Sequence, residues 1–150
     1  MRIIVQKCLS ANVIIGGKVY NEIKNGLVLL VGFTYNDSKK EIDYMVNKVK
    51  NLRIFDDNNG VMNLSVSDTG GEILSISQFT LYGDARKGNR PSYVKALNGK
   101  EASVLYDLFN ASLKESGLTV KTGVFGSDMK VSLINDGPTT IILEKENQNE

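Results

Sequence analysis

The alternation of apolar and polar positions predicts most of the strands of this chain. Residues 2–7 and 12–15 are rich in β-branched side chains and predict strands, and the pair Gly16-Gly17 predicts a hairpin turn before a returning strand at 19–23. The uninterrupted apolar run 26–33 is typical of a strand buried on both faces. The same reasoning predicts further strands at residues 72–81, 118–125, 129–134 and 139–144.

Two segments show the helical spacing of apolar residues. Ser38 and Glu41 form a capping box that predicts the start of one helix, and Asn98 with Glu101 predicts the start of a second, from about residue 100 to 116. The predicted buried stripes are Ile42, Met45, Val46, Val49 and Leu52 in the first helix and Ala102, Leu105, Phe109 and Leu113 in the second. We therefore predict an α+β fold, in which two helices pack on one face of a mixed or antiparallel β-sheet or open barrel.

Composition indicates one globular domain. The chain has 150 residues, of which 41% are hydrophobic and 23% charged, so we predict a single domain over residues 1–150 whose polar residues 145–150 form a frayed tail. The formal net charge of +1 provides no overall attraction to nucleic acid, so such contact would need a local basic patch. We find no export signal, no apolar run of membrane-spanning length and only one cysteine, Cys8, which together favour the cytoplasm.

The residue types that are missing restrict the chemistry. The absence of histidine and the single cysteine exclude serine–histidine and cysteine–histidine catalysis and a thiolate zinc site. The glycine-rich loops that bind nucleotide phosphates are also missing. We expect neither a metal nor a cofactor, and an enzyme of this composition would use hydroxyls, amides, backbone groups or groups of its substrate.

The dipeptide Gly137-Pro138 interrupts a region that otherwise predicts strand. Proline lacks a backbone donor and fits poorly inside a central strand, and an X-Pro bond is where a cis peptide costs least. The dipeptide is either a plain turn between two strands or a rigid element with a function.

Ser77-Gln78-Phe79-Thr80 closes a predicted strand. Its two hydroxyls and one amide suit a carbonyl, a ribose or a phosphate, because a strand end holds its side chains firmly. The alternative is an alternating strand whose polar residues face water.

Two further segments have both a structural and a functional interpretation. The loop with Arg86, Lys87 and Arg90 is either a solvated surface loop or one that contacts phosphates. Phe125 and Met129 flank a turn, where they either belong to the core or form the wall of a small pocket.

In this order and spacing, Ser77-Gln78-Phe79-Thr80, the basic loop and the segment 135–139 resemble D-aminoacyl-tRNA deacylase, the D-tyrosyl-tRNA deacylase family. The resemblance covers about residues 1–144. One departure is Asn89, where another basic residue is expected.

The resemblance implies a homodimer that hydrolyses the ester between a D-amino acid and the terminal adenosine of tRNA, and that also acts on glycyl-tRNA mischarged on tRNA(Ala). In that family the Gly-Pro bond is cis and enters the partner subunit's active site, where its carbonyl oxygens hold the substrate's amino group and exclude an L side chain. The matching residues are Gly137 and Pro138 for this chiral filter, Ser77, Gln78, Phe79 and Thr80 for the catalytic strand end, and Phe125 and Met129 for the adenosine pocket.

Two mechanisms and two other functions stay open at this point. Thr80 could be a nucleophile, although the sequence offers no base to activate it. We favour assistance by the 2′-OH of the terminal ribose, with backbone N–H groups near Phe79 and Thr80 stabilising the oxyanion. The other functions are a non-catalytic tRNA- or nucleotide-binding dimer and a purely structural dimer in which Gly137-Pro138 crosses the interface.

Overall fold

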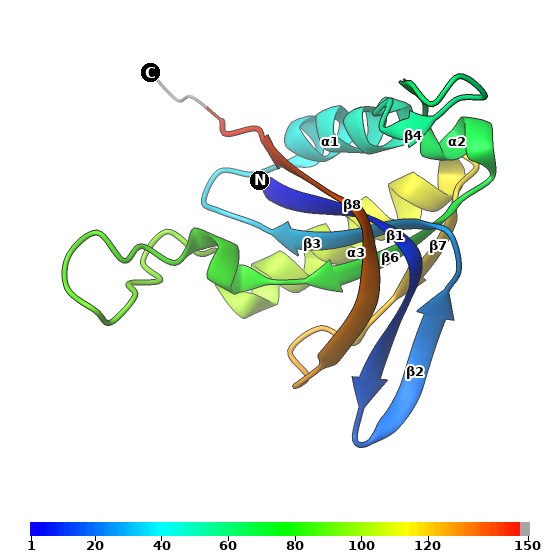
Figure 1. Ribbon diagram of the computed structural model, residues 1–150. Coiled ribbons are helices and arrows are strands. Elements are labelled where there is room, and N and C mark those ends of the chain that lie inside the picture. Colours follow the sequence, from blue (N-terminus) through cyan, green and yellow to red (C-terminus); the bar gives the residue numbers. More distant parts are fainter. Residues whose placement is uncertain (148–150) are drawn as a thin grey trace.

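The structure, a computed structural model, describes residues 1–147 and has an α+β architecture in which helices cover one face of a curved, mixed β-sheet (Figure 1). The strands of this sheet are β1 (Arg2–Ile15), β2 (Lys18–Ile23), β3 (Gly26–Gly32), β6 (Glu72–Ser77), β7 (Thr119–Thr122) and β8 (Lys130–Glu144). They run in the order β2-β1-β3-β6-β7, and β8 pairs with β1 along most of its length. The predicted fold class is confirmed.

Strands β3, β6 and β7 are parallel, which aligns their carboxyl ends. β3 is buried along nearly its whole length, as its apolar sequence predicts. Leu29 belongs to the core beneath the helices, whereas Val28 belongs to a second core on the opposite face. Because Val31 pairs with Ser77, the polar segment after β6 emerges beside the end of β3.

Helices α1 (Lys39–Asn51) and α3 (Gly99–Glu115) pack against each other and on the same face of the sheet (Figure 1). Both predicted N-caps are confirmed: Ser38 and Glu41 form a capping box, and the Glu101 N–H donates to Asn98 Oδ1 at 3.0 Å. Of the predicted stripes, the buried members are Ile42, Met45, Val49, Ala102, Phe109 and Leu113, and the partly buried ones are Val46, Leu52 and Leu105.

Three short elements were not predicted from the sequence. Residues 57–61 connect β4 (Phe55–Asp56) and β5 (Met62–Leu64), and the short helix α2 (Val66–Thr69) follows. Such elements are too short to show a periodicity in the sequence. Among the helices of residues 1–147, none combines the length and hydrophobicity needed to cross a bilayer.

Several predicted strand boundaries were wrong. The strand expected at 72–81 ends at Ser77 and is followed by a 3₁₀ helix, η1 (Phe79–Tyr82). The strand expected at 118–125 is the shorter β7. Segments 2–7 and 12–15 form one strand, β1, which continues through an irregularity in its pairing with β8 around Cys8.

The segments predicted as two strands on either side of Gly137-Pro138 likewise form one strand, β8. Asn135 pairs with Cys8 and Thr140 pairs with Gln6, so the residues between them stand out from the ladder as a bulge. The peptide bond between Gly137 and Pro138 is cis, and both residues are exposed.

The amide of Asn135 closes the neck of this bulge. Its Nδ2 donates to the carbonyl of Lys7 at 2.9 Å on the neighbouring strand and to the carbonyl of Thr139 at 3.0 Å across the bulge. On the far side, the Thr140 hydroxyl donates to the Pro138 carbonyl at 3.1 Å. These bonds anchor both ends of the bulge and present its tip to the outside.

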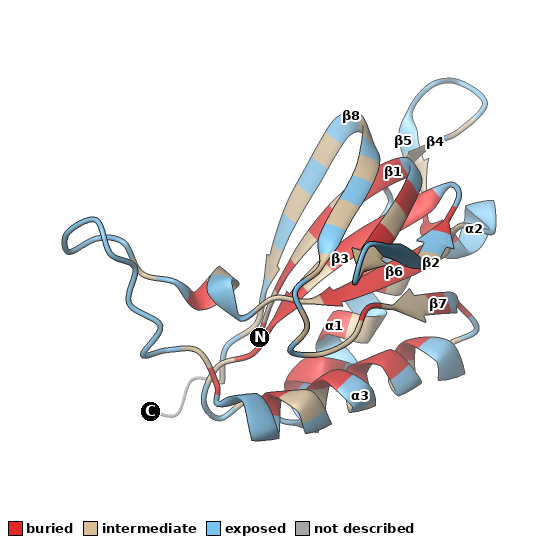
Figure 2. Ribbon diagram, turned by 90° about the horizontal axis from the view of Figure 1, so that it is seen from below, coloured by how far each residue is buried: buried red, intermediate tan, exposed pale blue. Residues whose placement is uncertain are grey.

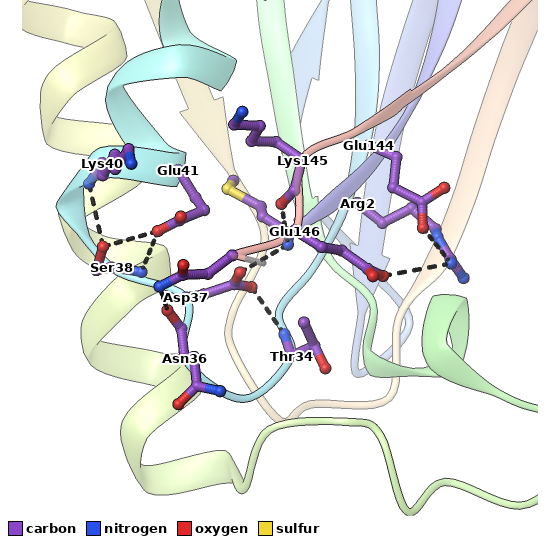
Figure 3. A network of polar contacts seen from close by, with 12 residues as sticks. Arg2, Thr34, Asn36, Asp37, Ser38, Lys40, Glu41, Glu144, Lys145 and Glu146 are labelled. Carbon is purple, nitrogen blue, oxygen red and sulfur yellow. Dashed lines mark hydrogen bonds and ion pairs between the residues drawn. The ribbon is translucent and has the colours of Figure 1, made fainter. Parts of the chain in front are cut away.

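The start of β1 and the end of β8 are joined by a buried polar network (Figure 3). The ammonium group of Met1 donates to Asp37 Oδ1 and to the Lys145 carbonyl, both at 2.7 Å, and the Lys145 N–H donates to the Met1 carbonyl at 2.9 Å. Lys145 is therefore bonded to the body of the protein, where we expected residues 145–150 to be frayed. Residues 148–150 of that predicted tail lie outside the described residues.

Candidate functional site

A cavity of about 520 Å³ lies at the carboxyl ends of β3 and β6. Its walls come from these two strand ends, from the start of α3 with the residues before it, and from the connection between β7 and β8. Parallel strands ending together next to a helix N-terminus are a common setting for a ligand site. The cavity falls within the size range of small-molecule sites.

The segment Ser77-Gln78-Phe79 forms the wall nearest the sheet. Ser77 is the last residue of β6, and the Gln78 N–H donates to the Val31 carbonyl at 2.7 Å. This bond fixes the point at which the chain leaves the sheet and turns into η1. Phe79 then lies at the rim, with 57% of its surface exposed.

Thr80 is placed differently from its three predecessors. It is exposed and, within residues 1–147, it is absent from the cavity wall. Its hydroxyl accepts a hydrogen bond from the Gln78 side-chain amide. A catalytic role for Thr80 stays a prediction, and three of the four residues of this motif line the cavity.

Phe125 and Met129 line the same cavity, although nearly 50 residues separate them from the Ser77 motif. The Phe125 ring packs against the ring of Tyr106, with 5.9 Å between the ring centroids. Met129 lies close over Gly123, where an added Cβ would stand 2.5 Å from the Met129 sulfur. Glycine at 123 thus leaves the space that Met129 occupies.

Tyr106 supports this wall from behind, and we did not predict it. It is buried, and its hydroxyl donates to the Ser75 carbonyl in β6 at 2.7 Å. Burial raises the pKa of the Tyr106 hydroxyl, which keeps it a neutral donor. Its place four residues after Ala102 on the apolar face of α3 is the sequence signal that would have found it.

The cavity is almost free of titratable groups. Among the described residues that line it, Asp128 is the single titratable side chain, and it is exposed and paired with Lys130 at 2.7 Å. Residues 1–147 contain no cluster of three or more histidine, cysteine or acidic side chains that could hold a metal ion. The arrangement suits an apolar ring and a neutral polar group, held by the hydroxyl of Ser77 and the amide of Gln78.

Gly137 and Pro138 lie elsewhere. Within the described part of the chain, neither residue belongs to the wall of this cavity, since the bulge sits beside Lys7 in the middle of β1. The structure therefore does not bring the two predicted motifs together within one chain.

The basic loop also lies outside the cavity wall formed by residues 1–147. Arg86 is engaged by Asp84, whose carboxylate accepts from the guanidinium at 2.7 to 3.1 Å, and this pairing lowers the pKa of Asp84 strongly. Lys87 and Arg90 are exposed on the same loop. Of the three phosphate candidates, Arg86 already has an opposite charge beside it.

Comparison with known proteins identifies close relatives over nearly the whole chain. The family described as D-Tyr-tRNA(Tyr) deacylase matches residues 4–144. A protein named D-aminoacyl-tRNA deacylase from Brevibacillus brevis is 53% identical over 144 residues, which are 96% of this chain and 99% of that protein. A protein of the same name from Listeria monocytogenes is 51% identical over 97% of both chains.

Solved structures show the same fold. A protein described as c-Myc DNA Unwinding Element Binding Protein superposes with a TM-score of 0.92 at 38% identity, covering 98% of this chain and 100% of that one. A structure described as a probable eukaryotic D-amino acid tRNA deacylase has a TM-score of 0.80 at 17% identity, covers 95% of this chain and 97% of its own, and shows the fold alone.

Proposed function

This chain belongs to the D-Tyr-tRNA(Tyr) deacylase family, and from that membership we propose that the cavity at the ends of β3 and β6 is where it hydrolyses its substrate. The enzyme is a hydrolase of ester bonds that acts on D-aminoacyl-tRNA. The observation that supports this location is the convergence of Ser77, Gln78 and Phe79 with Phe125 and Met129 on one cavity.

The walls suggest how the end of the tRNA is held. Phe125 and Met129 provide an apolar surface for the adenine, while Ser77 and Gln78 bind the ribose and the ester. The N–H groups that follow Gln78 stabilise the oxyanion of the tetrahedral intermediate. The neutral cavity offers no general base, so the 2′-OH of the terminal ribose assists the attack of water on the ester.

Selection against L-amino acids is assigned to Gly137 and Pro138 of a partner subunit. The bulge is exposed and lies away from the cavity of its own chain, so it is available to a second copy. In the proposed homodimer its carbonyl oxygens hold the ammonium group of the substrate, and the backbone leaves no space for an L side chain. Because glycine has no side chain to exclude, we expect the enzyme also to act on glycyl-tRNA mischarged on tRNA(Ala). We further propose that it works in the cytoplasm.

The direct test is release of tyrosine from D-Tyr-tRNA and L-Tyr-tRNA by the purified protein. We expect rapid release from the D-ester and none above background from the L-ester. Release from both would keep the hydrolase and remove the chiral filter. Binding of tRNA without release would instead favour a nucleic-acid-binding function, which the description of the 38% identical structure names for that protein.

Replacement of Thr80 by alanine is expected to leave deacylation of D-Tyr-tRNA within about tenfold of the wild type, since a positioned side chain is the most that this residue contributes. The position of Thr80 outside the described cavity wall supports this expectation. Single-turnover kinetics measure the effect. A loss of several orders of magnitude, with tRNA binding and the melting temperature unchanged, would point to an acyl-enzyme formed on the Thr80 hydroxyl.

A further inference from the structure

An exposed aromatic pair continues from the cavity onto the surface. Phe79 lines the cavity and contacts Tyr93, with 5.1 Å between the ring centroids and an interplanar angle of 65°. Tyr93 is itself 41% exposed, and its ring rests on the backbone of Gly83, where an added Cβ would lie 3.0 Å from Cε1. Two large aromatic rings are thus held in a fixed orientation at the surface, outside the core.

The loop between Asp84 and Ser92, which directly precedes Tyr93 in the sequence, projects from the body of the protein (Figures 1 and 2). Its neck is closed by two backbone hydrogen bonds of 2.8 Å between Asp84 and Ser92. From residue 85 to residue 97 the sequence has four cationic side chains and no acidic one. Three of them, Lys87, Arg90 and Lys95, are exposed, while Arg86 is paired with Asp84 at 2.7 Å.

We propose that Phe79 and Tyr93 form a stacking platform for the unpaired nucleotides that directly precede the terminal adenosine of the tRNA. Lys87, Arg90 and Lys95 lie along the path of their phosphates. The proposal rests on the proposed function, because the platform begins at the cavity that receives the adenosine. Exposed aromatic rings interleaved with cations are the chemistry that binds single-stranded RNA, since every base has a face that stacks.

Because the aromatic pair adjoins the cavity, it indicates the direction in which the RNA leaves the cavity. Phe79 both lines the cavity and contacts Tyr93, so a nucleotide that leaves the cavity past Phe79 meets this pair next. The positive charge of the projecting loop attracts the phosphates of the same strand. The platform would therefore contribute to affinity for tRNA and leave the chemical step unchanged.

The test compares two substrates, D-Tyr-tRNA and the D-tyrosyl ester of adenosine, which lacks the preceding nucleotides. For Tyr93→Leu we expect KM for D-Tyr-tRNA to rise about tenfold or more with kcat nearly constant, whereas KM for the adenosine ester stays at the wild-type value. Tyr93→Phe keeps the ring and should behave as the wild type. Tyr44→Leu removes a tyrosine of similar exposure, 39%, from α1 and is the matched control.

An equal loss on both substrates would overturn the proposal, because Tyr93 would then shape the adenosine cavity. Unchanged kinetics on both would overturn it as well. Binding of uncharged tRNA, with and without its last three nucleotides, gives a readout that is independent of hydrolysis. If the wild type binds the intact end more tightly and Tyr93→Leu reduces this difference, the platform is supported even if the protein does not hydrolyse the ester and the proposed function is wrong.

Discussion

Replacement of Gly137 by alanine is expected to lower the deacylation rate of D-Tyr-tRNA about 100-fold or more, since a displacement of about 1 Å at a positioning group can have this effect. Gly137 has φ +115°, a conformation that residues with a side chain rarely adopt. An added Cβ would also stand 2.6 Å from the Thr139 N–H nitrogen and still closer to the Thr139 hydroxyl. The bulge must therefore change shape, and the carbonyl groups at its tip move with it.

Gly60→Ala is the matched control for this variant. Gly60 also has a positive φ, +74°, at the tip of the β4–β5 hairpin, and an added Cβ there meets nothing within 4 Å. Both variants should lose about 1–3 kcal/mol of stability through backbone strain, but only Gly137→Ala should lose activity. Deacylation by Gly137→Ala at the wild-type rate would contradict a role for this bulge in the reaction.

Mixing two inactive variants tests whether the bulge acts across subunits. In Gly137→Ala the bulge is altered and the cavity is intact. In Ser77→Phe the added ring fills the cavity and the bulge is intact. In a homodimer with sites shared across the interface, random mixing should restore about a quarter of the wild-type sites, because half of the dimers are mixed and each has one complete site. No recovery after unfolding and refolding of the mixture would place the bulge and the cavity in separate functions.

The sequence predicted the locally determined features of this fold well. The helix starts at Ser38 and Asn98 depend on residues three positions apart, and both are found as expected. The end of β6 was missed because the apolar residues Phe79 and Leu81 alternate with Thr80 as in a strand, while the turn into η1 depends on the hydrogen bond to Val31 on another strand. Such bonds are determined by tertiary pairing, which a single segment does not reveal.

In the candidate site, too, local features were predicted from the sequence and features that depend on tertiary pairing were not. The individual motifs were recognisable, and five of their residues meet on one cavity. The arrangement of these motifs in space was not recognisable from the sequence, because it follows from the parallel pairing of β3 with β6 and from the long pairing of β1 with β8. The separation of Gly137 from the cavity of its own chain is thus a result of topology, and it is what makes a second subunit necessary to the proposed mechanism.

The largest effect on stability is expected at Asp37, far from the proposed chemistry. Its carboxylate and the ammonium group of Met1 are 2.7 Å apart, and both side chains are 0% exposed. Burial raises the pKa of the Asp37 carboxyl, so the carboxylate is retained there by its partners, the ammonium group and the Thr34 N–H at 2.8 Å. The contact joins the two charges directly (Figure 3), and each stabilises the other because neither is exposed to water.

Asp37→Asn is expected to lower the free energy of unfolding by about 3–5 kcal/mol, because it leaves a buried ammonium group without an opposite charge. Asp43→Asn is the matched control, since the Lys39–Asp43 pair on α1 has exposed fractions of 69% and 55% and should contribute at most about 0.5 kcal/mol. Urea unfolding of both variants at neutral pH, analysed for midpoint and slope, measures the difference. Equal, small decreases in the free energy of unfolding of the two variants would contradict this expectation. They would mean that water reaches the Met1 ammonium group between the end of β8 and the start of β1.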